Sequence, residues 1–189
     1  MNRGRDKFNK YKPVITILVK VTKMIPRRLR QKMFVFFRMT NGIKGIAIRY
    51  ILLKTIAEKC GDNVSVHPQV YLFNPQGLSI GNNVSIHPMS YIDAAGKIKI
   101  GNDVSIAHGV TIMSSTHRYE NRDVAIKDQS IDLLNTEIKD NVWVGAKVTL
   151  VAGVEVGSGS VLAAGAVVTK NISDNTIVGG VPAVKIKKR

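Results

Sequence analysis

The chain contains Ile80-Gly-Asn-Asn-Val-Ser85 and, further on, the near copy Ile100-Gly-Asn-Asp-Val-Ser105. Around these copies aliphatic residues recur at every sixth position in four successive runs: Val66, Leu72 and Leu78; Ile80, Ile86, Ile92 and Ile98; Ile100, Ile106 and Ile112; and, after an interruption, Ile138, Val144, Leu150, Val156, Leu162 and Val168. A period of six fits neither an α-helix nor an alternating strand. It fits a triangular coil, in which each hexapeptide forms a short strand and a corner and its aliphatic residue points inward. The repeat therefore predicts a left-handed parallel β-helix.

The same six-residue motif also recurs at intervals of one complete coil, which supports this fold. Cys60-Gly-Asp-Asn-Val-Ser65 precedes the first copy by one coil of three hexapeptides plus a two-residue bulge. Val156-Gly-Ser-Gly-Ser-Val161 follows Ile138-Lys-Asp-Asn-Val-Trp143 after three hexapeptides without a bulge. Self-similarity of this length is typical of solenoids, whose coils stack and need caps at both ends. A β-sandwich with Gly and Asn turns would not hold one register over so many hexapeptides.

The six-residue register fails once at length, between His117 and Asn135. The intervening residues 118–135 are polar and charged and have no six-residue pattern. Because the interior of the coil is filled, we expect this segment to project outward as a loop. Long loops in compact folds are usually functional, and His117 directly precedes this one.

These motifs resemble the maltose/galactoside O-acetyltransferase branch of the hexapeptide acyltransferases. The segments that carry the resemblance are Ser114-Ser-Thr-His117, the loop after it, Ile138-Lys-Asp-Asn-Val-Trp-Val-Gly145, Ala163-Ala-Gly-Ala-Val-Val-Thr-Lys170 and Val178-Gly-Gly-Val-Pro-Ala183. The resemblance covers about residues 60–186. It implies a homotrimer in which acetyl-CoA lies in a groove between neighbouring prisms, walled in part by the loop. It also implies O-acetylation of a sugar or polysaccharide, with His117 as the catalytic base.

The chemistry suits the residue type, because a neutral imidazole can take the proton of a hydroxyl as its oxygen attacks the thioester. The resemblance also implies that a backbone amide near Gly145 or Ala146 stabilises the oxyanion. The alternative for His117 is a solvated residue at the edge of a loop, and its position at the break favours catalysis. Cys60 occupies an inward aliphatic position, which argues against a covalent acyl-cysteine and for direct transfer.

Further site residues follow from the resemblance. The expected contacts to acetyl-CoA are Gly145, Ala146, Ala163, Ala164, Thr169, Lys170 and Lys185. On the acceptor side we expect Trp143, Asp93 and His87, with structural alternatives for each: packing between subunits for Trp143 and corner positions for the other two. His87 is expected to face the same side as His117 one coil earlier, whereas His67 and His108 are interpreted as corner residues. The histidine spacing does not match the γ-carbonic-anhydrase pattern, so no metal is expected.

Basic charge is concentrated at the start of the chain. Residues 1–59 hold 16 Lys+Arg and 2 Asp+Glu, a net of +14, and residues 60–189 have a net of only +1. We expect 1–59 to be a helical segment and 60–189 to be the acyltransferase domain. Apolar residues at helical spacing predict two amphipathic helices, at Ile25, Leu29, Met33, Phe36 and Phe37 and at Ile46, Tyr50, Leu53 and Ala57. Arg49 and Lys54 are expected on the polar face of the second helix. This segment resembles the capsule and colanic-acid acetyltransferases.

Such helices can lie on an anionic bilayer or cap the open end of the β-helix, and both roles are compatible. Nucleic-acid binding is not expected, because no recognised module is present. No apolar stretch is long enough to span a membrane, no signal peptide is evident, and the single cysteine fits a reducing compartment. The predicted location is cytoplasmic, at the inner face of a bacterial membrane. The alternatives are an acetyltransferase of antibiotics or nucleotide-linked amino sugars, and a non-catalytic scaffold tethered to the membrane.

Overall fold

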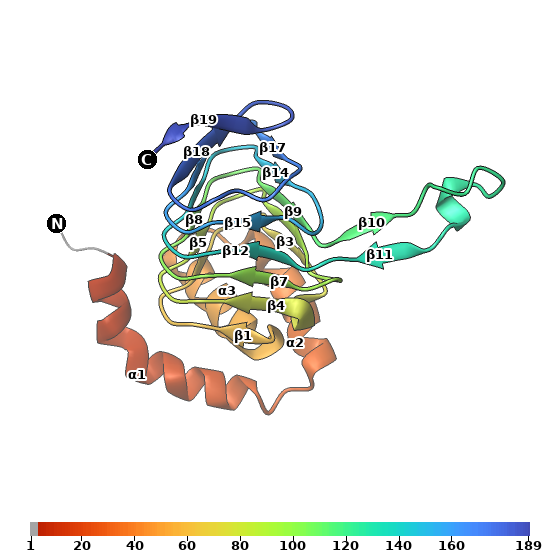
Figure 1. The fold of residues 1–189 in the computed structure, drawn as a ribbon. Coiled ribbons are helices and arrows are strands. Elements are labelled where there is room, and N and C mark those ends of the chain that lie inside the picture. Colours follow the sequence, from red (N-terminus) through yellow and green to blue (C-terminus); the bar gives the residue numbers. More distant parts are fainter. Residues whose placement is uncertain (1–3) are drawn as a thin grey trace.

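The computed structural model describes residues 4–189, so the first three residues of the predicted helical segment lie outside it. Its main body is a parallel β-helix with three walls (Figure 1). Wall A contains β1 (Lys59–Cys60), β4 (Leu78–Ile80), β7 (Ile98–Ile100), β12 (Thr136–Ile138) and β15 (Glu155–Val156). Wall B contains β2 (Ser65–Val66), β5 (Ser85–Ile86), β8 (Ser105–Ile106), β13 (Trp143–Val144), β16 (Val161–Leu162), β18 (Thr176–Gly179) and β19 (Val184–Lys188). Wall C contains β3 (Tyr71–Phe73), β6 (Tyr91–Asp93), β9 (Thr111–Met113), β14 (Thr149–Leu150) and β17 (Val167–Val168).

The predicted β-helix is confirmed, and the hexapeptide register explains it. Aliphatic residues one coil apart pair in parallel, as Ile80 does with Ile100 and Ile106 with Val144. All members of the aliphatic series are buried except Leu72, which is partly buried and packs against the core. Each buried aliphatic side chain contributes about 1.5–3 kcal/mol relative to an exposed one. The stacked interior therefore supplies the main driving force for folding.

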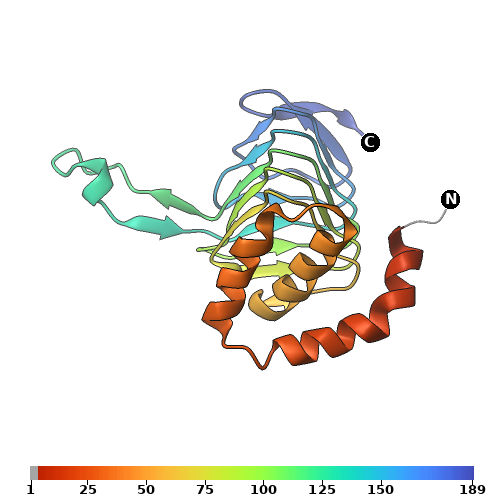
Figure 2. The ribbon, with the colours of Figure 1, turned by 180° about the vertical axis from the view of Figure 1, so that it is seen from behind.

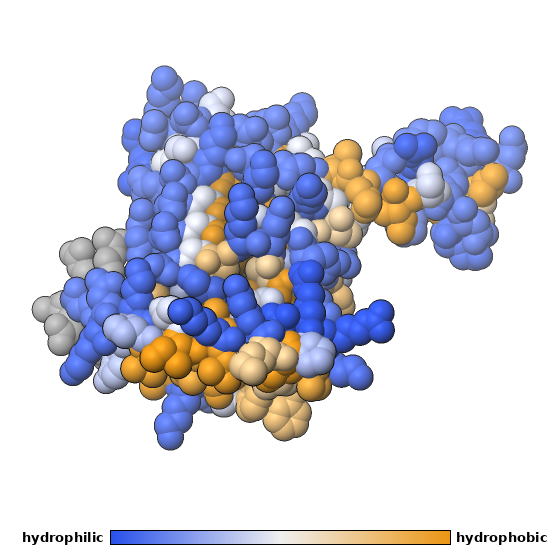
Figure 3. Space-filling view, turned by 90° about the horizontal axis from the view of Figure 1, so that it is seen from below, coloured by the Kyte–Doolittle hydropathy of each residue, from blue (hydrophilic) through white to orange (hydrophobic). Residues whose placement is uncertain are grey.

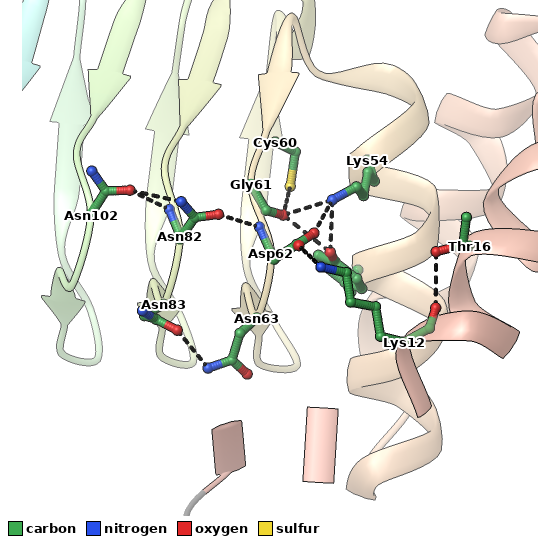
Figure 4. Close-up of polar contacts among 11 residues, drawn as sticks. Lys12, Thr16, Lys54, Cys60, Gly61, Asp62, Asn63, Asn82, Asn83 and Asn102 are labelled. Carbon is green, nitrogen blue, oxygen red and sulfur yellow. Dashed lines mark hydrogen bonds and ion pairs between the residues drawn. The ribbon is translucent and has the colours of Figure 1, made fainter. Parts of the chain in front are cut away.

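Asparagine and aspartate residues occupy equivalent positions at the corners between walls A and B and form hydrogen bonds from one coil to the next. Asn63, Asn83, Asp103 and Asn141 adopt positive φ angles of 55–58°, a conformation that Asn and Asp tolerate better than other non-glycine residues. The Nδ2 atom of Asn63 donates to Oδ1 of Asn83 at 3.1 Å (Figure 4). The same type of side-chain bond joins Asn83 to Asp103 at 3.1 Å. The repeated Asn-Asn and Asn-Asp pairs of the sequence are thus corner residues that bond one coil to the next.

The two extra residues of the longer coils lie at the corner between walls C and A. There, the 3₁₀ turn η2 (Pro75–Gly77) lengthens the connection between β3 and β4. The long loop leaves the β-helix at this same corner two coils later. It forms a projecting hairpin, the arm, made of β10 (Ser115–His117), the 3₁₀ turn η3 (Ile126–Asp128) and β11 (Ile131–Leu133), with the two strands antiparallel (Figure 1).

Helices cover the first coil. The two predicted helices are present as α2 (Arg27–Phe36) and α3 (Gly42–Ile56), joined through the 3₁₀ turn η1 (Phe37–Met39). A third helix, α1 (Gly4–Thr22), precedes these two and adds to the predicted pair. Leu52, Leu53 and Ile56 of α3 belong to the same buried cluster as the interior of the β-helix. The helical segment and the β-helix therefore share one core.

The prediction that Arg49 lies on a polar helix face is wrong. Its side chain is 0% exposed. Its Nε donates to the carbonyl of Val66 at 2.9 Å, and its Nη1 donates to those of Phe37 and Thr40 at 2.9 and 2.7 Å. Burial lowers the pKa of this guanidinium. Arg49 is thus the junction between α3, the segment after α2, and the first coil.

Basic residues of α2 also connect that helix to the C-terminal end of α3. Arg27 and Arg30 donate to the carbonyls of Ile56 and Thr55 at the end of α3, both at 2.5 Å. Cations at a helix C-terminus are favourable because they oppose the helix dipole. At the opposite end of the β-helix, β19 pairs antiparallel with β18 and closes the stack (Figure 2). None of the described helices is long and apolar enough to cross a bilayer.

Candidate active site

His117 is held on the arm, not at the end of a hexapeptide. It is the third residue of β10 and pairs with Ile131 of β11, so the outward excursion begins at Ser115 and not at Arg118 as predicted. Ser114 fixes the root of the arm: its buried hydroxyl donates to the carbonyl of Asp93 at 2.7 Å and accepts from the amide of Gly96 at 2.9 Å. The imidazole of His117 is exposed and is therefore open to a ligand or to another chain.

Asp93 lies at the corner between walls C and A, where the arm leaves the β-helix, and its carboxylate bonds to residues of the turns there. Its Oδ1 accepts hydrogen bonds from Nδ2 of Asn74 at 2.8 Å and from the amide of Ala95 at 3.2 Å. Asp93 thus shapes the turn at this corner, and within the described part of one chain His117 is not among its hydrogen-bond partners. The corner between walls C and A, which carries Asp93 and the arm, is called the CA edge below.

The corner between walls B and C, called the BC edge, holds another column of predicted residues. Two consecutive residues form this corner in each coil. In successive coils the pairs are His67-Pro68, His87-Pro88, Ala107-His108, Gly145-Ala146 and Ala163-Ala164. The prediction that His87 faces the same side as His117 is wrong, because the two lie on different edges. His87 stacks instead on His67, with ring centroids 4.5 Å apart and planes 11° from parallel. Burial, followed by the nearby His87 and Arg49, lowers the pKa of His67.

The backbone amides of the BC edge differ in availability. The amide of Gly145 donates to the carbonyl of Leu162 at 2.9 Å, so it is committed to stacking. An added Cβ at Gly145 would lie 2.6 Å from that oxygen, so the glycine is needed for close approach of the coils. The amides of Ala146 and Ala164 have no partner in the part of the chain that the structure describes. Pro68 and Pro88 occupy this same position in earlier coils, where the missing N–H costs nothing.

The other predicted residues are divided between the two edges. Trp143 lies on wall B directly before the BC edge and is 56% exposed. Thr169 and Lys170 are exposed at the CA edge, directly after β17. Lys185 is exposed on β19, near the last coil. A single chain therefore presents two partial sites, one on each side of wall C.

The outward surfaces of the walls differ in charge. Wall A carries a row of mostly charged residues, namely Lys59, Ser79, Lys99, Glu137 and Glu155. Along wall C the outward residues are uncharged except for Asp93 at its margin; they are Tyr71, Phe73, Tyr91, Thr111, Met113, Thr149, Val151, Val167 and Thr169. Phe73 and Tyr91 have ring centroids 5.0 Å apart. Wall C, whose outward row includes three aromatic side chains, is thus better suited than wall A to burial against another copy of the chain. Sequence reasoning missed this row, although Tyr71 and Tyr91 occupy equivalent positions in successive copies of the repeat.

Two other chemistries find no support in the described residues. Cys60 is largely covered, and its burial raises the pKa of the thiol to about 12, so little thiolate is present at neutral pH. Within residues 4–189 there is no group of three or more His, Cys, Asp or Glu side chains placed to hold a metal ion.

A parallel β-helix of hexapeptide coils with one projecting arm is the architecture that the resemblance to the hexapeptide acyltransferases predicts. The family model "Bacterial transferase hexapeptide (six repeats)" matches residues 135–170. Galactoside O-acetyltransferase of Escherichia coli is 30% identical over 164 residues, which cover 86% of this chain and 79% of that protein. A solved galactoside acetyltransferase in complex with coenzyme A superposes with a TM-score of 0.76 at 29% identity, covering 86% of this chain and 80% of the other. A maltose O-acetyltransferase from Clostridium difficile gives 0.73 at 26% identity, with 91% and 88% covered.

The chain therefore belongs to the hexapeptide-repeat acetyltransferase family and is similar to its galactoside and maltose O-acetyltransferases. As a member of this family, the chain is an acetyltransferase.

Proposed function

We propose that this enzyme transfers acetyl from acetyl-CoA to a hydroxyl of a sugar or polysaccharide during synthesis of a surface glycan. In this proposal the working unit is a homotrimer whose copies meet through wall C. The BC edge of one chain then faces the CA edge and arm of the next, which unites the two partial sites. The division of the predicted residues between the two edges that flank wall C is the observation that carries this proposal.

The reaction is a direct transfer. A nitrogen of His117 accepts the proton of the acceptor hydroxyl while the oxygen attacks the thioester carbonyl carbon. The carbon–sulfur bond of the tetrahedral intermediate then breaks, and the proton passes from the imidazolium to the departing thiolate, which leaves as CoA. The amide of Ala146 on the neighbouring chain is the proposed donor to the oxyanion, because that of Gly145 is committed to Leu162.

The remaining residues have proposed roles along the groove. Ala163, Ala164, Thr169, Lys170 and Lys185 border the CoA, and the lysines can pair with its phosphates. The acceptor side is lined by Trp143 and His87 from the BC edge and bounded by Asp93 from the opposite edge. A half-exposed tryptophan beside a groove suits stacking against a sugar ring, since it offers apolar area with a polar handle.

We also propose that the enzyme is cytoplasmic and contacts the inner face of the bacterial membrane peripherally, where a lipid-linked glycan is the acceptor. The charge of +14 within residues 1–59 supports this location.

The test of the function is an acetyl-transfer assay. Purified protein is incubated with acetyl-CoA and a panel of sugars and oligosaccharides, with antibiotics and nucleotide-linked amino sugars as competing classes. CoA thiol release is followed by a thiol reagent, and the product is identified by mass spectrometry. We expect acceptor-dependent release and O-acetylated sugar. Acetylation of only the other two classes would favour an alternative acceptor, and no release with any acceptor would favour a scaffold.

A further inference from the structure

Helix α1 carries more apolar surface than its packing uses. One stripe faces the protein: Val19 is 8% exposed, and Phe8 meets the ring of Tyr50 edge-on at 5.6 Å. The adjacent stripe is open and consists of Tyr11, Val14, Ile17, Leu18 and Val21, which are 44–62% exposed. Exposed apolar rows of this size mark interaction sites in otherwise polar surfaces.

Further exposed apolar residues follow α1 along the chain. They are Met24, Leu29, Val35, Phe36, Met39 and Ile43, which are 49–84% exposed. Seen from below, the molecule shows apolar residues gathered in one band bordered by hydrophilic ones (Figure 3). Figure 1 places α1 below the first coil, at the end of the β-helix opposite β18 and β19. The apolar surface therefore lies at one end of the prism, away from the last coils.

Helix α1 is fixed in this position by a charged contact. Lys12 of α1 and Lys54 of α3 both reach Asp62 of the first coil, at 2.6 and 2.7 Å (Figure 4). The hydrogen bonds from Lys12 and Lys54 lower the pKa of the Asp62 carboxyl. Lys12 projects on the side of α1 that faces the β-helix, so the contact leaves the apolar stripe free.

The positive charge around the apolar stripe of α1 indicates which kind of partner can bind it. Exposed basic residues accompany it, namely Lys10, Lys20, Lys23, Arg28, Lys32 and Lys44, and residues 1–59 contain only two acidic residues. A second copy of the chain would bring the same positive charge to the same place and be repelled. An anionic bilayer offers an apolar interior together with negative headgroups, and cationic amphipathic helices bind such surfaces.

We infer that α1 is the membrane-binding element, lying on an anionic lipid bilayer with Val14, Ile17 and Leu18 inserted among the lipids. The element is α1 and not α3, which is mostly buried. In a trimer with parallel prisms, three copies of α1 lie at the same end and bind one surface together. The inference rests on the proposed location of the enzyme and is independent of the chemistry of acetyl transfer.

The test is flotation of the full-length protein with vesicles of phosphatidylcholine alone or with 30 mol% phosphatidylglycerol, roughly the anionic content at which such surfaces attract basic segments. The first variant is Ile17→Glu with Leu18→Glu. The matched control is Asn9→Glu with Thr16→Glu, which adds the same charge to the same helix on its polar side. We expect the wild type to bind only to anionic vesicles. The affinity for these vesicles should fall roughly a hundredfold in the first variant and at most about tenfold in the control.

Three results would overturn the inference: equal losses in both variants, wild-type binding to neutral vesicles as strong as to anionic ones, and a fall in oligomeric state of the first variant without any wild-type vesicle binding. The last result would assign the stripe to a second copy. Acetyl transfer to a soluble sugar is measured in parallel. If wild type binds vesicles but transfers no acetyl group, the location stands and the proposed chemistry fails; the reverse pattern rejects only the inference.

Discussion

The variant His117→Ala is expected to lower kcat for acetyl transfer about 10²–10⁴-fold, the usual contribution of a positioned general base. Binding of CoA should be nearly unchanged, because the proposed role of the imidazole is to accept a proton and not to bind the donor. The measurement is steady-state thiol release at saturating acetyl-CoA, together with calorimetric titration of CoA.

A control on the same arm separates catalysis from damage to the hairpin. Lys127 is exposed in η3 and pairs with the adjacent Asp128 at 2.7 Å. Lys127→Ala should retain a kcat close to that of the wild type. If His117→Ala were as active as this control, the proposed base would be rejected. If it lost CoA binding in parallel with kcat, His117 would be a binding residue instead.

The second large effect concerns stability. Arg49→Met should lower the free energy of unfolding by about 2–4 kcal/mol, because the buried carbonyl of Val66 and the partly buried carbonyl of Thr40 lose their side-chain donor and each such loss costs about 1–3 kcal/mol. Removing a desolvated cation recovers part of this cost. The loss still dominates, because methionine offers no donor to either oxygen.

Equilibrium urea unfolding at fixed protein concentration, followed by circular dichroism, measures this change. Arg28→Met is the matched control, since Arg28 is exposed on α2, and it should change stability by less than about 0.5 kcal/mol. Equal unfolding midpoints for the two variants would show that Arg49 does not hold the helices to the first coil.

The repeat made most of the fold predictable. A six-residue period determines which side chains point inward, and the structure confirms this from Val66 to Val168. The helical segment was less predictable, because its arrangement depends on where its basic residues find acceptors. The helical spacing predicted a solvated Arg49, yet its side chain donates to three carbonyls from two separate parts of the chain.

Candidate site residues could be named from the sequence, but their arrangement in space could not. Motifs in the sequence pointed to His117 and Gly145 separately. They could not tell that the two lie on different edges, because that depends on which corner the arm leaves. The same limit explains the error with His87, whose distance from His117 along the chain suggested a shared face. The sequence did indicate that the amide of Ala146 is free of the stacking hydrogen bonds. Proline, which has no N–H, occupies the equivalent position at Pro68 and Pro88, so no hydrogen bond from this position is needed between coils.

The claim on which the account depends is that each active site combines the arm of one chain with the BC edge of the next. Subunit complementation tests it directly, with His117→Ala as the chain lacking a functional arm and Ala164→Trp as the chain with a blocked edge. In randomly mixed trimers of equal amounts, an intact arm meets an intact edge in about a quarter of the sites. The account predicts recovery of about a quarter of wild-type activity from two chains that are inactive alone. No recovery in verified mixed trimers would place the whole site within one chain and contradict the account.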